Sequence, residues 1–378
     1  MKKKMLILTN RTLHNGPRMI REFDTFQHDF AITAIGTTAP RENFVEYHHN
    51  AQFLPLPYKI FNAVCRRLYY RRLTNRIMEY YPVLEKYIRQ KSFDVIIIHD
   101  PVYLPLITRL KQKMKFVSVY NAHEYHPLEF EDRAGWQQGA GRYQYALYKN
   151  YLGGIDLLIN VCNGIATKCE IEFQKSSLVI PNVATRSTIA PTKNDGPLRL
   201  IYHGAIMPSR NIEDMIDVMK LLGDNFQLDL MGVVSKGNES YMNHLQTYAQ
   251  SIKNVSFIPP VAFDRIIPTI NNYDIGLFLL RPNNFNYTHA LPNKLYEFVQ
   301  AKLAIAIGPS LEMQDVVERY DLGVVSEDFS PESLAHKIRK MTRADISRFK
   351  ANAVVASQTE HAAHYSARYL EKLKSLLS

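Results

Sequence analysis

The amino-acid sequence predicts an α/β fold made of two doubly wound, Rossmann-like domains that face each other across a cleft. Short apolar segments alternate along the chain with longer amphipathic ones, which is typical of a parallel sheet covered by helices on both faces. The alternation stops in a stretch rich in Thr, Ser, Pro and Asn at 182–197, and it starts again at residue 198. A chain of 378 residues is long enough for two domains of about 150–200 residues each.

In the first half, apolar runs bounded by polar residues predict strands, and longer periodic stretches predict helices. The expected strands are 4–9, 30–36, 51–56, 94–99, 116–120, 157–162 and 178–181. The expected helices are 17–27, 75–90 and 140–152. We therefore expect a first domain at residues 1–185, followed by a linker at 186–197.

The second half repeats the same alternation. Its expected strands are 198–204, 227–233, 255–258, 274–280, 304–308 and 323–326. Its expected helices are 211–222, 241–252, 264–271 and 331–341. We expect a second domain at residues 198–345 and C-terminal helices at 346–378 that pack back on the first domain. The loops that follow the strands of both domains would point into the cleft, where open α/β sheets bind their ligands.

One further helix, between the strands 274–280 and 304–308, carries the most informative pattern. Pro292 marks its start, because proline is tolerated in the first helical turn. Three apolar residues follow at core-facing spacing: Leu295, Phe298 and Val299. Three polar residues share one face: Asn293, Lys294 and Glu297. A cation and free N–H groups at a helix start suit a phosphate, and a carboxylate one turn later suits ribose hydroxyls. The spacing alone also fits a surface helix with an ordinary Lys–Glu pair.

The net charge of +10 indicates a polyanionic partner or surface. Basic residues are densest from Lys59 to Arg76, a stretch without acidic residues in which tyrosines and a phenylalanine are interspersed. This mixture suits an anionic membrane interface, although the arginines do not gather on one side of a helical wheel. A solvated basic helix is the alternative. Nucleic-acid binding would rest on charge alone, so no nucleic-acid partner is expected.

The sequence predicts a cytoplasmic protein that lies peripherally on the inner face of the membrane. The apolar run near the N-terminus, Met5 to Leu8, is shorter than a signal-peptide core, and no run approaches the length of a membrane span. The three cysteines have neither metal-site nor disulfide spacing, and they are expected to be reduced thiols: Cys65, Cys162 and Cys169.

Several segments, in this order and spacing, resemble the GT-B glycosyltransferases and, within them, family 4, the retaining nucleotide-sugar-dependent enzymes. The resemblance runs from about residue 4 to residue 340. The segments that carry it are Asn15–Glu22, His99–Pro101, Asn121–Pro127, Val179–Asn182, Tyr202–Asn211 and Leu291–Glu297.

The resemblance implies a donor site in the second domain. Arg210 matches the basic residue that meets the donor diphosphate. Lys294 and the backbone N–H groups around Asn293 would add to the phosphate site, and Glu297 matches the carboxylate on the ribose hydroxyls. Gly204 ends the first strand of this domain, where glycine permits a tight turn close to the nucleotide.

The resemblance also implies that the first domain binds the acceptor. Gly16 would lie in a loop that passes close to the donor. His123 matches a polar residue near the reacting sugar, and with Glu124 it is expected to orient the substrates; a turn histidine bonded to the backbone is the alternative. Asp100 would orient the acceptor or cap the next turn.

Two positions depart from the family pattern. A glutamate that commonly contacts the donor sugar is replaced by His289, which leaves the sugar and the mechanism open. The residue after the loop glycine, often arginine, is Ala205, so the phosphate grip would depend on Arg210 and Lys294.

The expected activity is transfer of a sugar from a nucleotide-diphosphate sugar, with UDP as the expected nucleotide, to a glycan or lipid-linked glycan. Such transfer would serve surface polysaccharide or glycoconjugate synthesis, with retention and without a metal or other cofactor. The chain has no Asp-x-Asp triplet of the kind that holds a metal–diphosphate. A nucleotide-sugar 2-epimerase and a catalytically inactive nucleotide- or glycan-binding protein are the alternatives. A dehydrogenase is disfavoured, because no predicted strand is followed by Gly-x-Gly-x-x-Gly.

Overall fold

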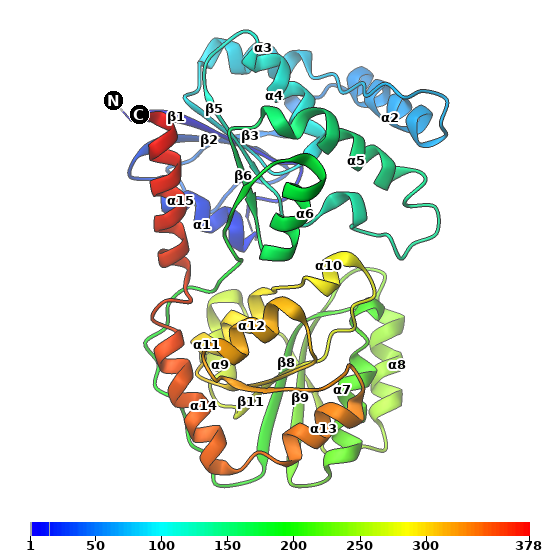
Figure 1. Cartoon of the computed structure of the whole chain (residues 1–378), viewed down its shortest axis with the longest axis vertical. Helices are drawn as coiled ribbons and strands as arrows, with labels where there is room; N and C mark the ends of the chain where they lie inside the picture. Colours follow the sequence, from blue (N-terminus) through cyan, green and yellow to red (C-terminus); the bar gives the residue numbers. More distant parts are fainter. Residues whose placement is uncertain (1, 15) are drawn as a thin grey trace. The chain divides into compact units, whose positions relative to one another are not determined.

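The computed structural model describes residues 2–14 and 16–378; Asn15, from the loop expected near the donor, lies outside them. The chain divides into two compact units (Figure 1). The first contains residues up to Pro181, residues 284–286 and the C-terminal residues from Tyr365. The second contains Asn182–Asn283 and Tyr287–His364. Residues 182–197 form no helix or strand.

The sheet of the first unit is parallel throughout, with the strand order β3–β2–β1–β4–β5–β6–β7. Its strands are β1 (Lys3–Leu8), β2 (Phe30–Gly36), β3 (Glu46–His49), β4 (Val95–Ile98), β5 (Val117–Asn121), β6 (Leu157–Asn160) and β7 (Ser177–Val179). The strand order reverses between β1 and β4. Loops diverge at this switch point, which makes it the usual ligand position in a doubly wound sheet.

The helices of the first unit are α1 (Pro17–Phe26), α2 (Leu56–Tyr70), α3 (Pro82–Lys91), α4 (Leu104–Lys111), α5 (Ala140–Tyr151), α6 (Asn163–Phe173) and most of α15 (Ala362–Leu377). The last helix lies beside α1 although it ends the chain (Figure 1). The rings of Phe26 and Tyr369 meet edge to face with centroids 5.0 Å apart, and Lys374 pairs with Asp29 at 2.6 Å.

Two expected elements of this unit are wrong. The strand expected at 51–56 is absent among the described residues; the third strand is β3, and α2 begins at Leu56. Pro55 and Pro57 explain the error, because proline cannot donate to a sheet but fits the first helical turn. The helix expected at 75–90 begins only at Pro82, because a proline disfavours the helical conformation of the residue that precedes it.

The second unit repeats the arrangement with the parallel order β10–β9–β8–β11–β12–β13. Its strands are β8 (Leu198–Ile206), β9 (Phe226–Val234), β10 (Val255–Ile258), β11 (Ile275–Phe278), β12 (Ala304–Ile307) and β13 (Gly323–Val325). Its helices are α7 (Ile212–Leu222), α8 (Glu239–Ala249), α9 (Ile266–Ile270), α11 (Asn293–Gln300), α12 (Leu311–Arg319), α13 (Pro331–Arg339) and α14 (Arg343–Ala356). The short helix α10 (Phe285–Thr288) lies at the boundary of the two units. Here the strand order reverses between β8 and β11.

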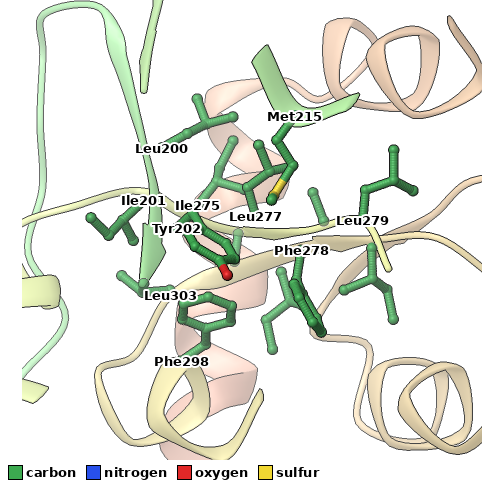
Figure 2. Close-up of a cluster of buried hydrophobic side chains, with 14 of the residues drawn as sticks. Leu200, Ile201, Tyr202, Met215, Ile275, Leu277, Phe278, Leu279, Phe298 and Leu303 are labelled. Atoms are coloured by element: carbon green, nitrogen blue, oxygen red, sulfur yellow. The ribbon is translucent and has the colours of Figure 1, made fainter. Parts of the chain in front are cut away.

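The core of the second unit fixes the position of α11. Leu295, Phe298 and Val299 are almost fully buried, as their spacing predicts, and Figure 2 shows Phe298 among the side chains of the sheet core. The ring of Phe298 lies where a side chain on Gly276 would be, so a larger residue in β11 would push the helix away. Glycine at this position therefore lets α11 begin directly over the switch point of β8 and β11.

Candidate active site

The ammonium group of Lys294 lies in an aromatic box at the start of α11. Its Nζ is 3.8 Å from the ring centroids of both Tyr202 in β8 and Phe278 in β11, and only 8% of the residue is exposed. Two such contacts partly compensate for lost hydration. Burial nevertheless lowers the pKa of Lys294 well below 10.5, the charge of Arg210 lowers it further, and Glu297 opposes the shift. Lys294 is thus a desolvated cation at the switch point of the sheet.

Gly204 makes room for this ammonium group. Its φ of +129° is a conformation that side chains rarely adopt, and a Cβ built there would lie 3.3 Å from Lys294 Nζ. The backbone at the end of β8 therefore approaches the cation directly. The tight turn expected at Gly204 is wrong, because β8 continues to Ile206 and Gly204 pairs with Gly232 inside the sheet. Its closeness to a nucleotide stays a prediction.

Glu297 lies one turn after Lys294 and is 5% exposed. Its Oε2 is 3.4 Å from Nε2 of His203, a buried residue of β8. Burial and then the charge of Lys294 lower the pKa of His203 to about 3, so this imidazole is neutral at physiological pH. A neutral imidazole can lie beside the Glu297 carboxylate without neutralising its negative charge.

A pocket of about 430 Å³ opens beside Glu297 within the second unit. Its walls come from two further segments, the linker residues 184–188 and the α9 region at 263–268. Phe263, 46% exposed, supplies an aromatic wall, while Arg186 and Ser187 are among the polar residues. The volume is in the range of small-ligand sites. One face of Glu297 thus looks onto a space large enough for a nucleoside.

Arg210 is half-buried and follows β8 in a 3-10 turn, Pro208–Arg210. Its guanidinium carbon lies 5.1 Å from the ring centroid of Tyr287, whose hydroxyl is 2.8 Å from Ser209 Oγ. The charge of Arg210 acts on Lys294, as the lowered pKa of the lysine shows. The two cations that the resemblance places at the phosphate therefore lie within electrostatic reach of each other.

Asn293 and His289 flank this group. Asn293 is the first residue of α11 and is half-buried. His289 is also half-buried, and its Nδ1 lies 3.5 Å from Glu312 Oε1 at the start of α12. The carboxylate of Glu312 therefore lies beside His289, the residue that stands where the resemblance leads us to expect a glutamate. Ala205 is exposed, and its carbonyl accepts a 2.8 Å hydrogen bond from the Tyr202 hydroxyl.

In the first unit, His123 and Glu124 follow the carboxyl end of β5. His123 is half-buried and Glu124 is exposed. Nε2 of His123 lies 3.0 Å from Nδ1 of His99, which follows β4. Burial, followed by the charge of Arg18, lowers the pKa of His123 well below 6.5. The side chain of His123 therefore pairs with a second histidine, whereas the alternative reading expects it to bond the backbone of its turn.

Asp100 and Gly16 have clear local roles in the structure. One oxygen of Asp100 accepts hydrogen bonds from Thr9 Oγ1 at 3.0 Å and from the Asn10 backbone N–H at 2.7 Å. Asp100 thus joins the ends of β1 and β4, in line with a structural role. Gly16 caps α1 with φ −84°, and a Cβ there would lie 3.3 Å from Met19 Cγ.

A second pocket, of about 440 Å³, lies at the carboxyl ends of β1 and β2 in the first unit. Its polar lining includes Asn10, Asn62, Arg66 and Tyr103, and α2 forms one of its walls. Arg66 is held there by both oxygens of Glu79, at 2.5 and 2.8 Å. This pocket is the natural candidate for a ligand of the first unit.

The outer surface of α2 carries apolar residues that the basic pattern concealed. Exposed apolar side chains recur every fourth residue along the helix: Leu56, Ile60, Val64 and Leu68. Phe61 and Leu73 extend this surface, which we call the α2 stripe. The exposed apolar residues therefore form one continuous face of α2. The arginines within residues 59–76 were not expected to form such a face.

The sequence did not predict the aromatic rings of Tyr202 and Phe278 around the Lys294 ammonium group. It also did not predict His203 as the neighbour of Glu297. It also missed Glu22 and His99 behind His123. Strand order could have revealed the first group, because β8 and β11 are neighbours at the switch point and their carboxyl ends meet at one edge. No comparable pattern marks Glu22, whose role depends on how α1 packs on the sheet.

Solved structures with the same fold cover nearly the whole chain. Sucrose-phosphate synthase from Thermosynechococcus elongatus is 12% identical, with a TM-score of 0.76 over 99% of both chains. HepE of Anabaena in complex with UDP is 14% identical, with a TM-score of 0.71 over 99% of this chain and 100% of that chain. S. aureus TarM in complex with UDP, fondaparinux and α-GlcNAc-glycerol is 10% identical, with a TM-score of 0.71 over 98% and 99% of the two chains. No protein-family model and no curated protein sequence matches the chain. The chain therefore has the GT-B fold, as predicted.

The part of the chain that the structure describes lacks two features, a metal-ion cluster and a membrane-spanning helix. Across residues 2–14 and 16–378, no group of three or more His, Cys, Asp and Glu side chains is arranged to hold a metal ion. In the same part of the chain, no helix is long and apolar enough to cross a membrane.

Proposed function

We propose that the protein is a glycosyltransferase that moves a sugar from a nucleotide-diphosphate sugar to a glycan or lipid-linked glycan. The observation that carries this proposal is the pair Lys294 and Glu297 on the first turns of α11. A desolvated cation beside a helix N-terminus favours a diphosphate, and a carboxylate one turn later faces a pocket of nucleoside size. The fold shared with nucleotide-sugar enzymes adds support.

The donor would be held by three groups of contacts. Lys294, Arg210 and the N–H groups around Asn293 would bind the diphosphate, because cations in a dry site stabilise a departing anion strongly. Glu297 would accept hydrogen bonds from the ribose hydroxyls. The base would enter the pocket beside Phe263, and UDP is the nucleotide we propose. His289, with Glu312 beside it, would contact the donor sugar.

The reaction we propose proceeds with retention and without a metal or other cofactor. The bond between the anomeric carbon and the diphosphate oxygen breaks while the acceptor oxygen bonds the same face of that carbon. The acceptor proton passes to the departing diphosphate, so no protein base is required. His123 and Glu124 of the first unit would orient the substrates, with Gly16 close to the donor.

The acceptor would occupy the 440 Å³ pocket of the first unit. The α2 stripe lies on the helix that forms one wall of this pocket. Its apolar side chains are exposed, and the basic residues Lys59, Arg67 and Arg71 lie on the same helix or at its end, a combination that suits anionic lipid. We propose that α2 rests on the inner membrane face and presents lipid-linked acceptors to the pocket behind it. The protein would then act at that surface in surface polysaccharide or glycoconjugate synthesis.

The proposal is tested by incubating the protein with UDP-glucose, UDP-galactose, UDP-N-acetylglucosamine and GDP-mannose, each with a bacterial lipid-linked glycan extract. Labelled product and released nucleotide are measured together, and NMR of the product gives its anomeric configuration. Arg210→Ala should abolish transfer, whereas Arg319→Ala, an exposed arginine of α12, should not. An altered donor sugar without transfer would indicate a 2-epimerase. Nucleotide binding without turnover would indicate a binding protein and contradict the enzymatic proposal.

A further inference from the structure

Two buried polar side chains at the end of α11, Gln300 and Lys302, bind the backbone of the linker that lines the pocket beside Glu297. Gln300 is fully buried and Lys302 is 2% exposed. The side-chain carbonyl of Gln300 accepts a 2.8 Å hydrogen bond from the backbone N–H of Ser187. Nζ of Lys302 donates to the backbone carbonyl of Ser187 at 3.3 Å. Both backbone polar groups of Ser187 are therefore held from the same helix end.

The same two side chains are anchored on other parts of the second unit. The amide nitrogen of Gln300 donates to the carbonyl of Ser357 at 3.1 Å and to that of Glu360 at 2.9 Å, in the segment that follows α14. Nζ of Lys302 also donates to the carbonyl of Gln300 at 3.2 Å. The groups that reach Ser187 therefore cannot turn away from it without breaking further buried hydrogen bonds, which is costly.

Asn271, at the end of α9, joins a third segment to this group. Its side-chain nitrogen donates to the carbonyl of Ala190 in the linker at 3.0 Å and to that of Ala301 at the end of α11 at 2.9 Å. The linker, the α9 region and α11 are the segments whose residues line the pocket. Among the described residues that line it, none of these three polar side chains is present. They act on the pocket through the backbone that they hold.

Lys302 occupies a position that suits glycine better than lysine. The backbone N–H groups of Lys302 and Leu303 close α11 with the paired hydrogen bonds of a Schellman motif. Lys302 is the left-handed residue of this motif, with φ +60°, where glycine is usual. Burial, followed by the charge of Arg186, also lowers the pKa of Lys302 to about 8. The lysine is therefore unfavourable for the helix end itself, and what it adds is the hydrogen bond to the linker.

We propose that Gln300 and Lys302 are positioning residues that hold the linker wall of this pocket in the shape that binds the base of a nucleotide. Among the described residues that line the pocket, Glu297 is present and the two cations assigned to the diphosphate are not, so the linker faces the nucleoside end of the ligand. Arg186 and Thr188 flank the tied residue and line the pocket. The identity of the ligand rests on the proposed function, whereas the ties rest on contacts within the second unit alone.

The test compares variants of the full-length protein by calorimetry with UDP and with pyrophosphate. Lys302→Gly relieves the strained backbone and removes the tie, so it should unfold at about the same urea concentration as the wild type but bind UDP about tenfold more weakly. Lys302→Met keeps the strain and the length of the side chain but cannot donate, so it should show the same loss of affinity. Gln300→Leu should lose UDP affinity similarly, at a larger cost in stability. Pyrophosphate has no base and should bind all three variants as it binds the wild type.

Asp321→Gly is the matched control. Asp321 closes α12 with the same pair of backbone hydrogen bonds and with φ +48°, but it is exposed and is not among the described residues that line the pocket. The variant should bind UDP like the wild type. Hydrogen–deuterium exchange of peptides that cover residues 184–190 adds a measurement without ligand. The exchange should become faster in both Lys302 variants and stay the same in Asp321→Gly.

Unchanged UDP binding in both Lys302 variants, an equal loss of UDP and pyrophosphate affinity, or unchanged exchange of the linker would overturn the inference. These results would leave the proposed function standing if the wild type still transferred sugar. A wild type that binds UDP but transfers no sugar would contradict the proposed function, and the ratio of UDP to pyrophosphate affinity in the variants would still decide the inference. If the wild type bound no nucleoside diphosphate, both proposals would fail.

Discussion

Lys294 Nζ lies 3.8 Å from the ring centroid of Tyr202, and the ring of Phe278 is equally close. A lysine in such a place is unfavourable to the empty protein, because its charge has lost most of its water and faces a second cation, Arg210. A diphosphate would remove the imbalance by supplying negative charge. Sites that are unfavourable without a ligand and favourable with one are typical of function rather than of stability.

Replacing the lysine should therefore separate stability from binding. Lys294→Met keeps the length of the side chain and removes the charge, so the free energy of unfolding without ligand should stay the same or rise. Affinity for a nucleoside diphosphate should fall by about 1.5–3 kcal/mol, roughly 10- to 150-fold in Kd. Urea unfolding and isothermal titration calorimetry measure the two effects. A variant that is clearly less stable and binds normally would show that Lys294 is a structural residue.

Diphosphate binding should take up protons. The pKa of Lys294 is lowered in the folded protein, so between this depressed pKa and 10.5 the empty site holds less than a full proton there. The penalty of the buried charge is full below the depressed pKa and disappears above 10.5, so the stability of the empty protein should rise with pH through that window. Bound phosphate raises the pKa again. Titrations in buffers of different ionisation enthalpy should show proton uptake toward pH 9 in the wild type and none in Lys294→Met.

Gly204→Ala should impair binding beyond its cost in stability. Its backbone strain should cost about 1–3 kcal/mol of unfolding free energy, and its methyl group would in addition crowd the Lys294 ammonium. Gly237→Ala is the matched control, because Gly237 also has a positive φ, +94°, but has nothing within 4 Å of an added Cβ. Both variants should unfold at lower urea concentration, and only Gly204→Ala should bind nucleotide more weakly. Equal binding by the two would mean that the cation does not contact the ligand.

Glu297→Gln should weaken binding through the ribose alone. The substitution keeps the shape of the side chain and removes its charge, so a nucleoside diphosphate should bind about 10- to 100-fold more weakly, whereas pyrophosphate should bind as before. A 2′,3′-dideoxy nucleotide should bind the wild type and the variant equally, because the hydroxyls that distinguish them are missing. Calorimetry with these three ligands decides the point; a pyrophosphate affinity that falls in parallel would place Glu297 in the phosphate site.

The α2 stripe should bind anionic vesicles. Ile60→Glu and Val64→Glu place negative charge on its exposed apolar face and should reduce co-sedimentation with phosphatidylglycerol vesicles at least several-fold, because they remove apolar contact and add repulsion. Val355→Glu, on the equally exposed surface of α14, is the control and should sediment like the wild type. If all three variants sediment alike, the stripe does not rest on lipid.

The sequence predicts most of the fold because strand and helix alternate regularly and most strands are bounded by turn residues. The two errors both involve prolines near α2 and α3. Pro55 was included in a strand, and Pro82 in the interior of a helix, although each marks a helix start in the structure. The apolar face of α2 is not predicted either, because basic residues stand between its exposed apolar side chains, which recur only at every fourth position.

The candidate site could be predicted only in part. The spacing on one helix singles out Lys294 and Glu297 as candidates, and their roles stay predictions. Their partners Tyr202 and His203 come from a strand about ninety residues earlier in the sequence. Contacts of this kind depend on strand order, which local patterns do not contain. Glu22 and His99 were missed for the same reason, since α1 and β4 meet only after the sheet has formed.

The central claim is that the second unit binds a nucleoside diphosphate through Arg210, Lys294 and Glu297. Thermal unfolding of the purified protein with UDP, GDP, CMP, ADP, dTDP or NAD, each with and without magnesium, tests it most directly, because a ligand of the native state raises the melting temperature. We predict that UDP raises it with or without magnesium, and that the shift is lost in Arg210→Ala and Glu297→Ala. No shift with any nucleotide, or a shift that both variants retain, would contradict the assignment of this site.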